Sequence, residues 1–192
     1  MLKILKAPQA VLSQKTQPVV KISAKGGPAS GWNKKTLEII EEMKKTLNAQ
    51  NNPKGVGLAA PQIGYSLQIF ITKPYPKSPF RIFINPKIAW LSEELTNGVP
   101  ERENPLEGCL SLPGIWGNVR RHLAIKLKYV TPDGKINHQF FKGFLATIIQ
   151  HEMDHLSGCL FPQRVLEQKG KLYRITGKDK EGKDILEEIE IK

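Results

Sequence analysis

The sequence predicts an α+β fold in which antiparallel or mixed sheets pack around a central helix. Helical periodicity occurs in two segments, residues 34–48 and 143–156, and most strand-like segments lie one after another between them. Helices and strands do not alternate as in βαβ folds, which favours antiparallel pairing. The chain has 192 residues, 40% hydrophobic and 24% charged, as is typical of one globular domain. We expect residues 1–166 to form that domain and residues 167–192 to form a tail.

The first helix is predicted over residues 34–48. Asn33 is a residue type that caps helix N-termini. Behind it, side chains suited to one buried face recur at helical spacing: Thr36, Leu37, Ile40, Met43 and Leu47. Glu41 and Lys45 are four residues apart, where opposite charges stabilise a helix. Residues 51–55, Asn-Asn-Pro-Lys-Gly, are expected to end it, and residues 1–30 are expected to form an extended arm with loops.

The middle of the chain is predicted to form strands. Strand-like segments occupy residues 67–72, 81–85, 88–91, 123–130 and 136–141. Residues 123–130 alternate, and a turn sequence at residues 131–134, Thr-Pro-Asp-Gly, leads from them to the partner strand at residues 136–141. The proline-rich residues 73–79 and the polar residues 92–106 are expected to be loops.

The second helix is predicted over residues 143–156. Four side chains share one face of it: Phe144, Ile148, His151 and His155. Gly158 lies just beyond the helix, where glycine commonly ends one. In the tail, residues 173–176 and 185–191 flank a glycine-containing polar turn, so we expect a β-hairpin or a strand there.

The second helix contains His151-Glu152-Met153-Asp154-His155, which makes it a candidate metal site. Residues i and i+4 lie on one helix face, so both imidazoles can bind one ion. Glu152 would then lie beside a metal-bound water and accept its proton. Metal-assisted hydrolysis suits this arrangement, although two histidines at this spacing can also be ordinary packed residues.

A catalytic metal usually has three protein ligands and one open position, so a third ligand is expected elsewhere. Cys109 is favoured because it lies in residues 107–114, where glycines allow close approach of the backbone. A thiolate also favours zinc or iron over magnesium or calcium. His122 and His138 are alternatives, but each lies on or beside a strand-like segment without a supporting motif.

Two other potential ligands are expected to have structural roles. Asp154 points away from the face of the two histidines, and either support of a residue that binds the metal or a structural hydrogen bond is expected for it. Cys159 lies among apolar residues, where burial is the expected state. Two cysteines in a chain of this length do not indicate a disulfide scaffold. No apolar run is long enough to span a membrane and the N-terminus does not resemble a secretory signal, so a cytoplasmic protein is expected.

The formal net charge of +11 favours acidic partners. RNA or the ribosome surface would suit it, whereas scattered, solvated lysines are the simpler explanation. Aromatic residues make up 7% of the chain, and none interleaves in the sequence with a basic run as a stacking platform requires.

Three motifs together resemble those of peptide deformylases. They are Gly-Val-Gly-Leu-Ala-Ala-Pro-Gln at residues 55–62, Glu-Gly-Cys-Leu-Ser at residues 107–111 and Gln-His-Glu-Met-Asp-His at residues 150–155. Their order and separation are similar to those of the family. The resemblance covers roughly residues 1–166, so it implies that this region is the catalytic domain.

The resemblance implies removal of the formyl group from the N-terminal formyl-methionine of newly made polypeptides, with release of formate. It implies that Cys109, His151 and His155 bind one divalent metal ion, Fe(II) in the cell, with zinc, nickel or cobalt able to replace it. Metal-bound hydroxide would attack while Glu152 acts as general base and then acid. The Gln62 side chain and the Leu110 N–H would stabilise the oxyanion, and the alternative role of Gln62 is to cap its own loop.

The resemblance also implies a set of substrate-binding residues: Gly55, Val56, Gly57, Gly108, Phe144 and Ile148. The glycines at 55 and 57 would let an extended peptide add as a strand, and the apolar residues would form the methionine pocket. A nascent formyl-methionyl chain is thus the expected partner, the ribosome surface is a second one, and a monomer that does not contact membranes is expected.

The chain departs from the family pattern at Trp116, where many members have an arginine. This departure leaves open how the rest of the peptide is bound. Glu107 and Arg121 match a pair that braces the cysteine loop in the family, and a solvated ion pair at the rim of the site is the alternative. Two other functions remain open: a zinc endopeptidase, which would share the His-Glu-x-x-His pattern, and a non-catalytic RNA binder.

Overall fold

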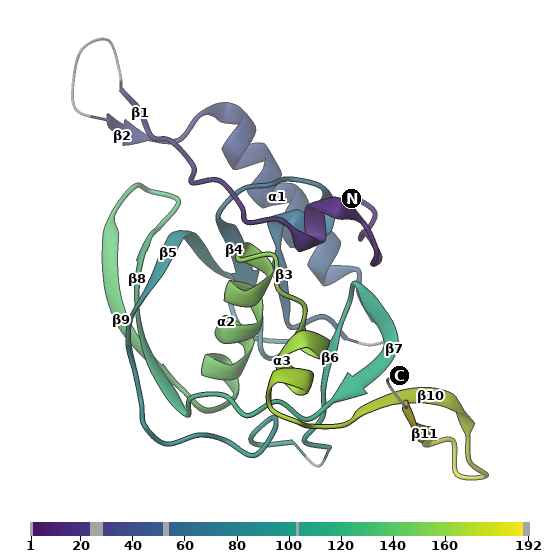
Figure 1. The fold of residues 1–192 in the computed structure, drawn as a ribbon. Coiled ribbons are helices and arrows are strands. Elements are labelled where there is room, and N and C mark those ends of the chain that lie inside the picture. Colours follow the sequence, from purple (N-terminus) through teal and green to yellow (C-terminus); the bar gives the residue numbers. More distant parts are fainter. Residues whose placement is uncertain (1, 24–28, 52–53, 103, 190–192) are drawn as a thin grey trace.

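We analysed a computed structural model of the chain, which describes residues 2–23, 29–51, 54–102 and 104–189. The helices in these residues are α1 (Lys34–Asn48), α2 (Gly143–Leu156) and α3 (Phe161–Glu167), with short 3-10 helices η1 (Ala10–Ser13) and η2 (Ala60–Ile63). The paired strands of the three sheets all run antiparallel. The predicted α+β class with sheets around the helix that carries both histidines is confirmed (Figure 1).

A five-stranded sheet forms the larger half of the fold. Its order is β3 (Gly57–Ala59), β4 (Ile69–Thr72), β5 (Arg81–Leu91), β8 (Ala124–Val130) and β9 (Ile136–Lys142). The two strand-like segments predicted at residues 81–85 and 88–91 are one strand, β5, whose pairing with β8 shifts register between them. Strand β3 was not predicted, because three residues are too few to show a period.

Each face of this sheet packs against a different helix. One face carries Phe70, Phe83 and Leu127, which form a core with Ile149 of α2. The opposite face carries Ile69, Ile71 and Ile84, which pack against α1. The sheet is therefore buried on both faces at its centre, and α2 is fixed in place along its whole length.

Helix α1 has the predicted bounds, and its cap is the predicted one. The Asn33 side chain accepts a hydrogen bond from the Thr36 N–H at 2.7 Å. Two details of the prediction were wrong. Leu37 is 41% exposed and Ile39 is buried in its place, because the covered face of the helix is centred on Ile39 and Met43. Glu41 pairs with Lys44, three residues on, rather than with Lys45.

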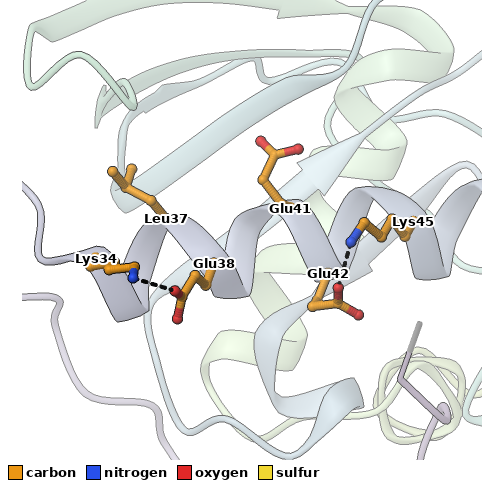
Figure 2. Close-up of a pocket in the computed structure, with 6 residues that line it drawn as sticks. All are labelled: Lys34, Leu37, Glu38, Glu41, Glu42 and Lys45. Atoms are coloured by element: carbon orange, nitrogen blue, oxygen red, sulfur yellow. Dashed lines mark hydrogen bonds and ion pairs between the residues drawn. The ribbon is translucent and has the colours of Figure 1, made fainter.

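The exposed side of α1 has a shallow hollow that is formed by residues of this helix alone (Figure 2). Leu37 lines it together with two ion pairs of the same helix, Lys34 with Glu38 at 3.8 Å and Lys45 with Glu42 at 2.8 Å. Exposed pairs of this kind contribute little to stability, typically below about 1 kcal/mol. The hollow is thus a consequence of side-chain spacing on the helix surface.

A four-stranded sheet lies on the other side of α2. Its order is β11 (Asp184–Ile189), β10 (Leu172–Lys178), β7 (Leu112–Gly117) and β6 (Glu107–Cys109). Strands β6 and β7 were not predicted, because the glycines and proline in them have low strand propensity. The segment after α3 forms the β10–β11 hairpin, which joins the sheet by pairing with β7. Residues 190–192, where part of the expected tail lies, are outside the described residues.

The remaining segments differ in how far the sequence predicted them. The arm at residues 1–30 contains η1 and a short pairing of β1 (Ile22–Ser23) with β2 (Ala29–Gly31), neither of which was predicted. Helix α2 has the predicted bounds, and Gly158 beyond it has a positive φ of 75°. Helix α3 was not predicted, although Phe161-Pro162 at its start is a recognised helix beginning.

None of the helices in the described residues is both long and apolar enough to cross a membrane.

Candidate metal centre

One thiol and two imidazoles converge where the two sheets meet α2. Cys109 is the last residue of β6, and His151 and His155 are one turn apart on α2. One ligand atom from each residue lies within 4.8 Å of the others. The Cys109 Sγ is 3.2 Å from the His155 Nε2. The structure thus brings together the three residues that the sequence nominated as ligands.

The donor set fits a single divalent ion. In a tetrahedral site, metal–sulfur and metal–nitrogen distances of about 2.3 and 2.0–2.1 Å place the donors about 3–4 Å apart. His151 Nδ1 lies 2.7 Å from the Glu107 Oε1, which leaves its Nε2 as the donor that can face an ion. One thiolate and two imidazoles are also a donor set typical of zinc and iron.

The electrostatics of the three residues also favour a cation. Burial raises the pKa of the Cys109 thiol, but the rings of His155 and His151 outweigh this and hold it well below its ordinary value. Burial lowers the pKa of His151, but Glu107 and Cys109 raise it well above the ordinary value. The surroundings of Cys109 therefore favour the deprotonated thiol, which is the form that binds a metal ion.

Glu107 holds His151 in place and is itself held by Arg121. The Arg121 Nη2 and Nε lie 2.6 and 2.7 Å from the two Glu107 oxygens, a bidentate ion pair with both side chains buried. The Arg121 Nη1 also donates to Asp154 at 3.0 Å, and Asp154 accepts from Arg164 of α3 at 2.8 Å. The expected structural hydrogen bond of Asp154 and the expected Glu107–Arg121 pair are both present. A chain of ion pairs thus ties β6 to α2 and α3.

Helix α3 contributes a contact that sequence reasoning missed. The Phe161 ring stacks against the His151 ring with centroids 6.3 Å apart and an interplanar angle of 29°. Phe161 is 1% exposed. The His151 ring is therefore fixed by Glu107 at its Nδ1 and by Phe161 on its face.

Glu152 lies beside the three candidate ligands with a free carboxylate oxygen. It is 3% exposed, and its Oε2 has no hydrogen-bond partner among the described residues. Burial raises the pKa of Glu152 to about 7. A buried carboxylate with an unpaired oxygen costs free energy unless something binds there. This oxygen is thus placed to bind a water or a substrate proton.

Gln62 of η2 also lies next to Cys109, and its side-chain amide points to the sulfur. Its Oε1 accepts the Ala59 N–H at 2.8 Å, which orients the amide. Its Nε2 then points to the Ser111 Oγ at 3.2 Å and to the Cys109 Sγ at 3.6 Å. Ser111, which sequence reasoning did not nominate, is fully buried and its N–H donates to the same sulfur at 3.4 Å. The sequence signal that could have identified Ser111 is its short polar side chain two residues after Cys109.

The nominated substrate-binding residues fall into two groups. Gly57 of β3 and Ile148 of α2 lie directly beside Glu152, because a Cβ built on Gly57 would be 2.2 Å from the Glu152 Oε1 and 2.9 Å from the Ile148 Cγ2. Phe144, one helical turn before Ile148, is 6% exposed, and the Arg102 guanidinium lies 4.3 Å from its ring. These residues line one side of Glu152.

The second group consists of Gly55 and Val56, which precede β3, and Gly108 of β6. A Cβ built on Gly55 would be 2.6 Å from Leu47 of α1, and one built on Gly108 would be 2.9 Å from the Trp116 ring. Val56 lies between the two glycines of its motif, and its carbonyl accepts the Lys73 N–H at 2.8 Å. Trp116, the departure from the family pattern, thus covers Gly108 next to Cys109.

The alternative ligands lie apart from this group. His138 is exposed on β9, and His122 Nδ1 is 2.5 Å from the Ser92 carbonyl oxygen. Cys159 is buried, as expected, and its thiol donates to the Leu160 carbonyl at 3.6 Å. None of the three belongs to the ligand group found among the described residues.

Comparison with known proteins agrees with this geometry. The family model described as polypeptide deformylase matches residues 1–171. The chain belongs to the peptide deformylase family. A peptide deformylase from Fusobacterium nucleatum is 38% identical over 176 residues, covering 91% of this chain and 95% of the relative.

Solved deformylase structures share the fold. A structure of the class I type b peptide deformylase from Acinetobacter baumannii bound to Met-Ala-Ser has 32% identity and a TM-score of 0.69, covering 85% of this chain and 98% of that one. The peptide deformylase from Thermotoga maritima has 29% identity and a TM-score of 0.68, covering 85% and 97%. The family match ends at residue 171, just before β10 of this deformylase begins. The division of the chain into a catalytic domain at residues 1–166 and a tail at residues 167–192 stays a prediction.

Replacing Glu107 by glutamine is expected to destabilise this deformylase by about 3–5 kcal/mol at pH 7, because the buried Arg121 would lose its bidentate partner and keep only Asp154 as a charged partner. Burial raises the pKa of Glu107, but Arg121 and His151 hold it well below its usual value of 4.5. The stabilisation is therefore present above about pH 4.5 and is lost as the pH falls towards the lower folded pKa.

Urea unfolding in the presence of a chelator measures this effect without a contribution from metal. The difference in the free energy of unfolding between wild type and Glu107→Gln should become smaller below pH 4.5. Glu167→Gln is the matched control, because it removes an exposed partner of Arg164 and is expected to cost less than about 1 kcal/mol. Equal losses in the two variants would contradict a stabilising role for the buried pair.

Proposed function

We propose that this deformylase removes the formyl group from the N-terminal formyl-methionine of newly made polypeptides and releases formate. The observation that carries the proposal is the position of Glu152. Its buried Oε2, which has no hydrogen-bond partner in the part of the chain that the structure describes, belongs to a carboxylate beside the convergent Cys109, His151 and His155 in a chain of the deformylase family. This is the arrangement that metal-assisted amide hydrolysis requires.

Cys109, His151 and His155 are proposed to hold one divalent ion. When bound, that ion would supply Lewis acidity and lower the pKa of a coordinated water. The chain supplies the rest of the chemistry. Glu107 fixes the tautomer of His151 by its 2.7 Å contact with Nδ1, and Phe161 fixes the plane of that ring.

Glu152 is proposed to move the proton. With a pKa of about 7, the carboxylate is available as a base near neutral pH and can return the proton afterwards. It would accept the proton of the attacking water as the oxygen bonds to the formyl carbon. It would then donate that proton to the departing amine nitrogen as the C–N bond breaks.

Gln62 and Leu110 are proposed to stabilise the oxyanion that develops on the formyl oxygen. The Gln62 Nε2 is held towards Cys109 by the bond from Ala59 to its Oε1. The Leu110 N–H follows Cys109 directly in the chain. Loss of one such donor typically slows a reaction about 10²–10³-fold.

The peptide is proposed to bind along β3. This strand is an end strand of the five-stranded sheet, so an extended peptide could add beside Gly55, Val56 and Gly57. Phe144 and Ile148 would contact the methionine side chain. The Met-Ala-Ser peptide bound to the Acinetobacter baumannii relative supports this assignment of substrate.

The donor set and the proposed substrate also bear on the metal ion, the cellular compartment and the partners of the protein. Fe(II) is proposed as the ion in the cell, with zinc, nickel or cobalt able to replace it, because the thiolate donor disfavours magnesium and calcium. The proposed compartment is the cytoplasm, where formylated chains are made. The protein is proposed to be a monomer. It is also proposed to meet nascent chains at the ribosome surface, and the net charge of +11 supports this contact.

A formate-release assay tests the proposed function. The metal-loaded protein should release formate from formyl-Met-Ala and leave an internal peptide with blocked ends uncut. Cleavage of the blocked peptide without formate release would indicate a zinc endopeptidase instead.

Replacing Gly57 by alanine is expected to lower formate release by at least about tenfold. The added Cβ would meet Glu152 at 2.2 Å and Ile148 at 2.9 Å, so the general base must move, and small displacements of reacting groups can cost about 10²-fold. Gly31→Ala is the matched control, because a Cβ there meets no atom of the described residues within 4 Å. Wild-type turnover in Gly57→Ala would show that Glu152 is not confined by β3.

A further inference from the structure

Part of one face of the five-stranded sheet is not covered by any helix of residues 2–23, 29–51, 54–102 and 104–189. Ile125, Leu127 and Phe141 face α2 on the other side, and the core around α1 reaches this face through β4 and Ile84 of β5. Over β8, β9 and the end of β5, large side chains are exposed instead, with Trp90 48% and Phe140 61% exposed. In Figure 1, β8 and β9 extend beyond the part of the sheet next to α1.

The strand register places aromatic and basic side chains in rows across this face. Trp90 of β5 is opposite Lys126 of β8, which is opposite Phe140 of β9. The two rings meet edge to face with centroids 5.7 Å apart, and the Lys126 Nζ lies 5.1 Å from the Phe140 ring. Opposite residues on neighbouring strands point to the same side of a sheet, so these three form one exposed row.

More lysines surround this row. Lys87 is opposite Lys128 in the next row, and Lys142 of β9 is opposite Ala124. We call Lys87, Trp90, Lys126, Lys128, Phe140 and Lys142 the basic–aromatic face. Strands β5, β8 and β9 contain no aspartate or glutamate. The nearest acids in the sequence lie in the loops, Glu93 after β5 and Asp133 before β9, and Asp133 pairs with Lys135 at 2.9 Å.

We propose that the basic–aromatic face binds an unpaired stretch of RNA. A single strand offers alternating phosphates and bases, and lysines beside exposed rings suit both, the ammonium groups contacting phosphates and the rings stacking on bases. A membrane surface would instead favour an apolar patch with a basic rim, whereas here Lys126 comes from the strand between those of the two rings and its Nζ lies over the Phe140 ring. The choice of RNA over DNA rests on the proposed function, because newly made polypeptides emerge beside RNA.

Fluorescence anisotropy with a labelled twelve-nucleotide oligouridine, titrated with the full-length, metal-loaded protein, tests this proposal. Trp90→Ala/Phe140→Ala should weaken binding at least about tenfold, since stacking on one ring is worth about that much per base. Trp90→Phe/Phe140→Tyr should retain it, because it keeps both rings. Formate release from formyl-Met-Ala should be the same in all of these variants, which separates this proposal from the proposed enzymatic function.

The contribution of charge to RNA binding is tested with two double variants that change the net charge equally. Lys126→Glu/Lys128→Glu should weaken binding and flatten its salt dependence by about 1.4 in log–log slope, at about 0.7 per lost phosphate contact. Lys3→Glu/Lys180→Glu changes the net charge equally at exposed sites elsewhere and should bind almost as wild type. Equal effects of the two charge variants, no effect of ring removal, or no binding by wild type at 50 mM salt would overturn the proposal. So would tighter binding to oligodeoxythymidine or ring-dependent binding to anionic vesicles alone.

Discussion

Replacing Glu152 by glutamine is expected to reduce the rate of formate release about 10²–10⁴-fold, which is the usual contribution of a general acid–base catalyst. Glutamine has nearly the same shape, so the 3% exposed site should remain packed. It cannot accept the proton of the attacking water or return it to the amine. The substitution removes the function of the Glu152 Oε2, the oxygen that lacks a hydrogen-bond partner among the described residues.

Metal content decides how that loss is interpreted. Glu152 is not among the three convergent ligands, so Glu152→Gln should retain one ion per chain. Glu181→Gln, an exposed carboxylate paired with Lys183 at 3.2 Å, is the control for the chemical change itself and should keep wild-type turnover. Wild-type turnover in metal-loaded Glu152→Gln would refute the proton-transfer role.

Replacing Cys109 by alanine is expected to cost most of the bound metal and, with it, turnover. Even changes to residues that only hold a ligand typically lower metal affinity 10–100-fold, so loss of the one sulfur donor should lower it by at least about 100-fold. Metal analysis after gel filtration, together with the formate assay, measures both effects.

Cys159 offers a matched control for this variant. It is the other free, buried cysteine, and its thiol contacts the Leu160 carbonyl rather than the histidines. Cys159→Ala should therefore keep one ion per chain. Parallel loss of metal from both cysteine variants would point to general unfolding rather than to loss of a ligand.

The parts of the fold that the sequence predicted are those with their own local signals. Helices α1 and α2 are 15 and 14 residues long, long enough for a period to show, and Asn33 and Gly158 mark an end of each. Strands β3 and β6 have three residues each and exist because of the strands they pair with. Helix α3 is only seven residues long and packs through Phe161 and Val165, so its stability depends on tertiary contacts.

The candidate site shows the same division. The spacing of His151 and His155 on one helix face follows from helix geometry alone. That Cys109 reaches them depends on how β6 packs against α2, which the sequence could only suggest. Ser111 and Phe161 were missed because their roles arise from neighbours distant in the sequence.

The basic–aromatic face is the clearest case of information held only by the structure. The sequence shows no aromatic residue interleaved with a basic run, because Trp90, Lys126 and Phe140 come from three different strands. Pairing in the sheet creates the alternation across the strands rather than along one of them.

The most direct test of the central claim is X-ray absorption spectroscopy of the protein loaded with one zinc ion. Coordination by Cys109, His151 and His155 predicts one sulfur at about 2.3 Å and two imidazole nitrogens at about 2.0–2.1 Å, with one further light atom. A spectrum without a sulfur neighbour, or with a single imidazole, would contradict the account.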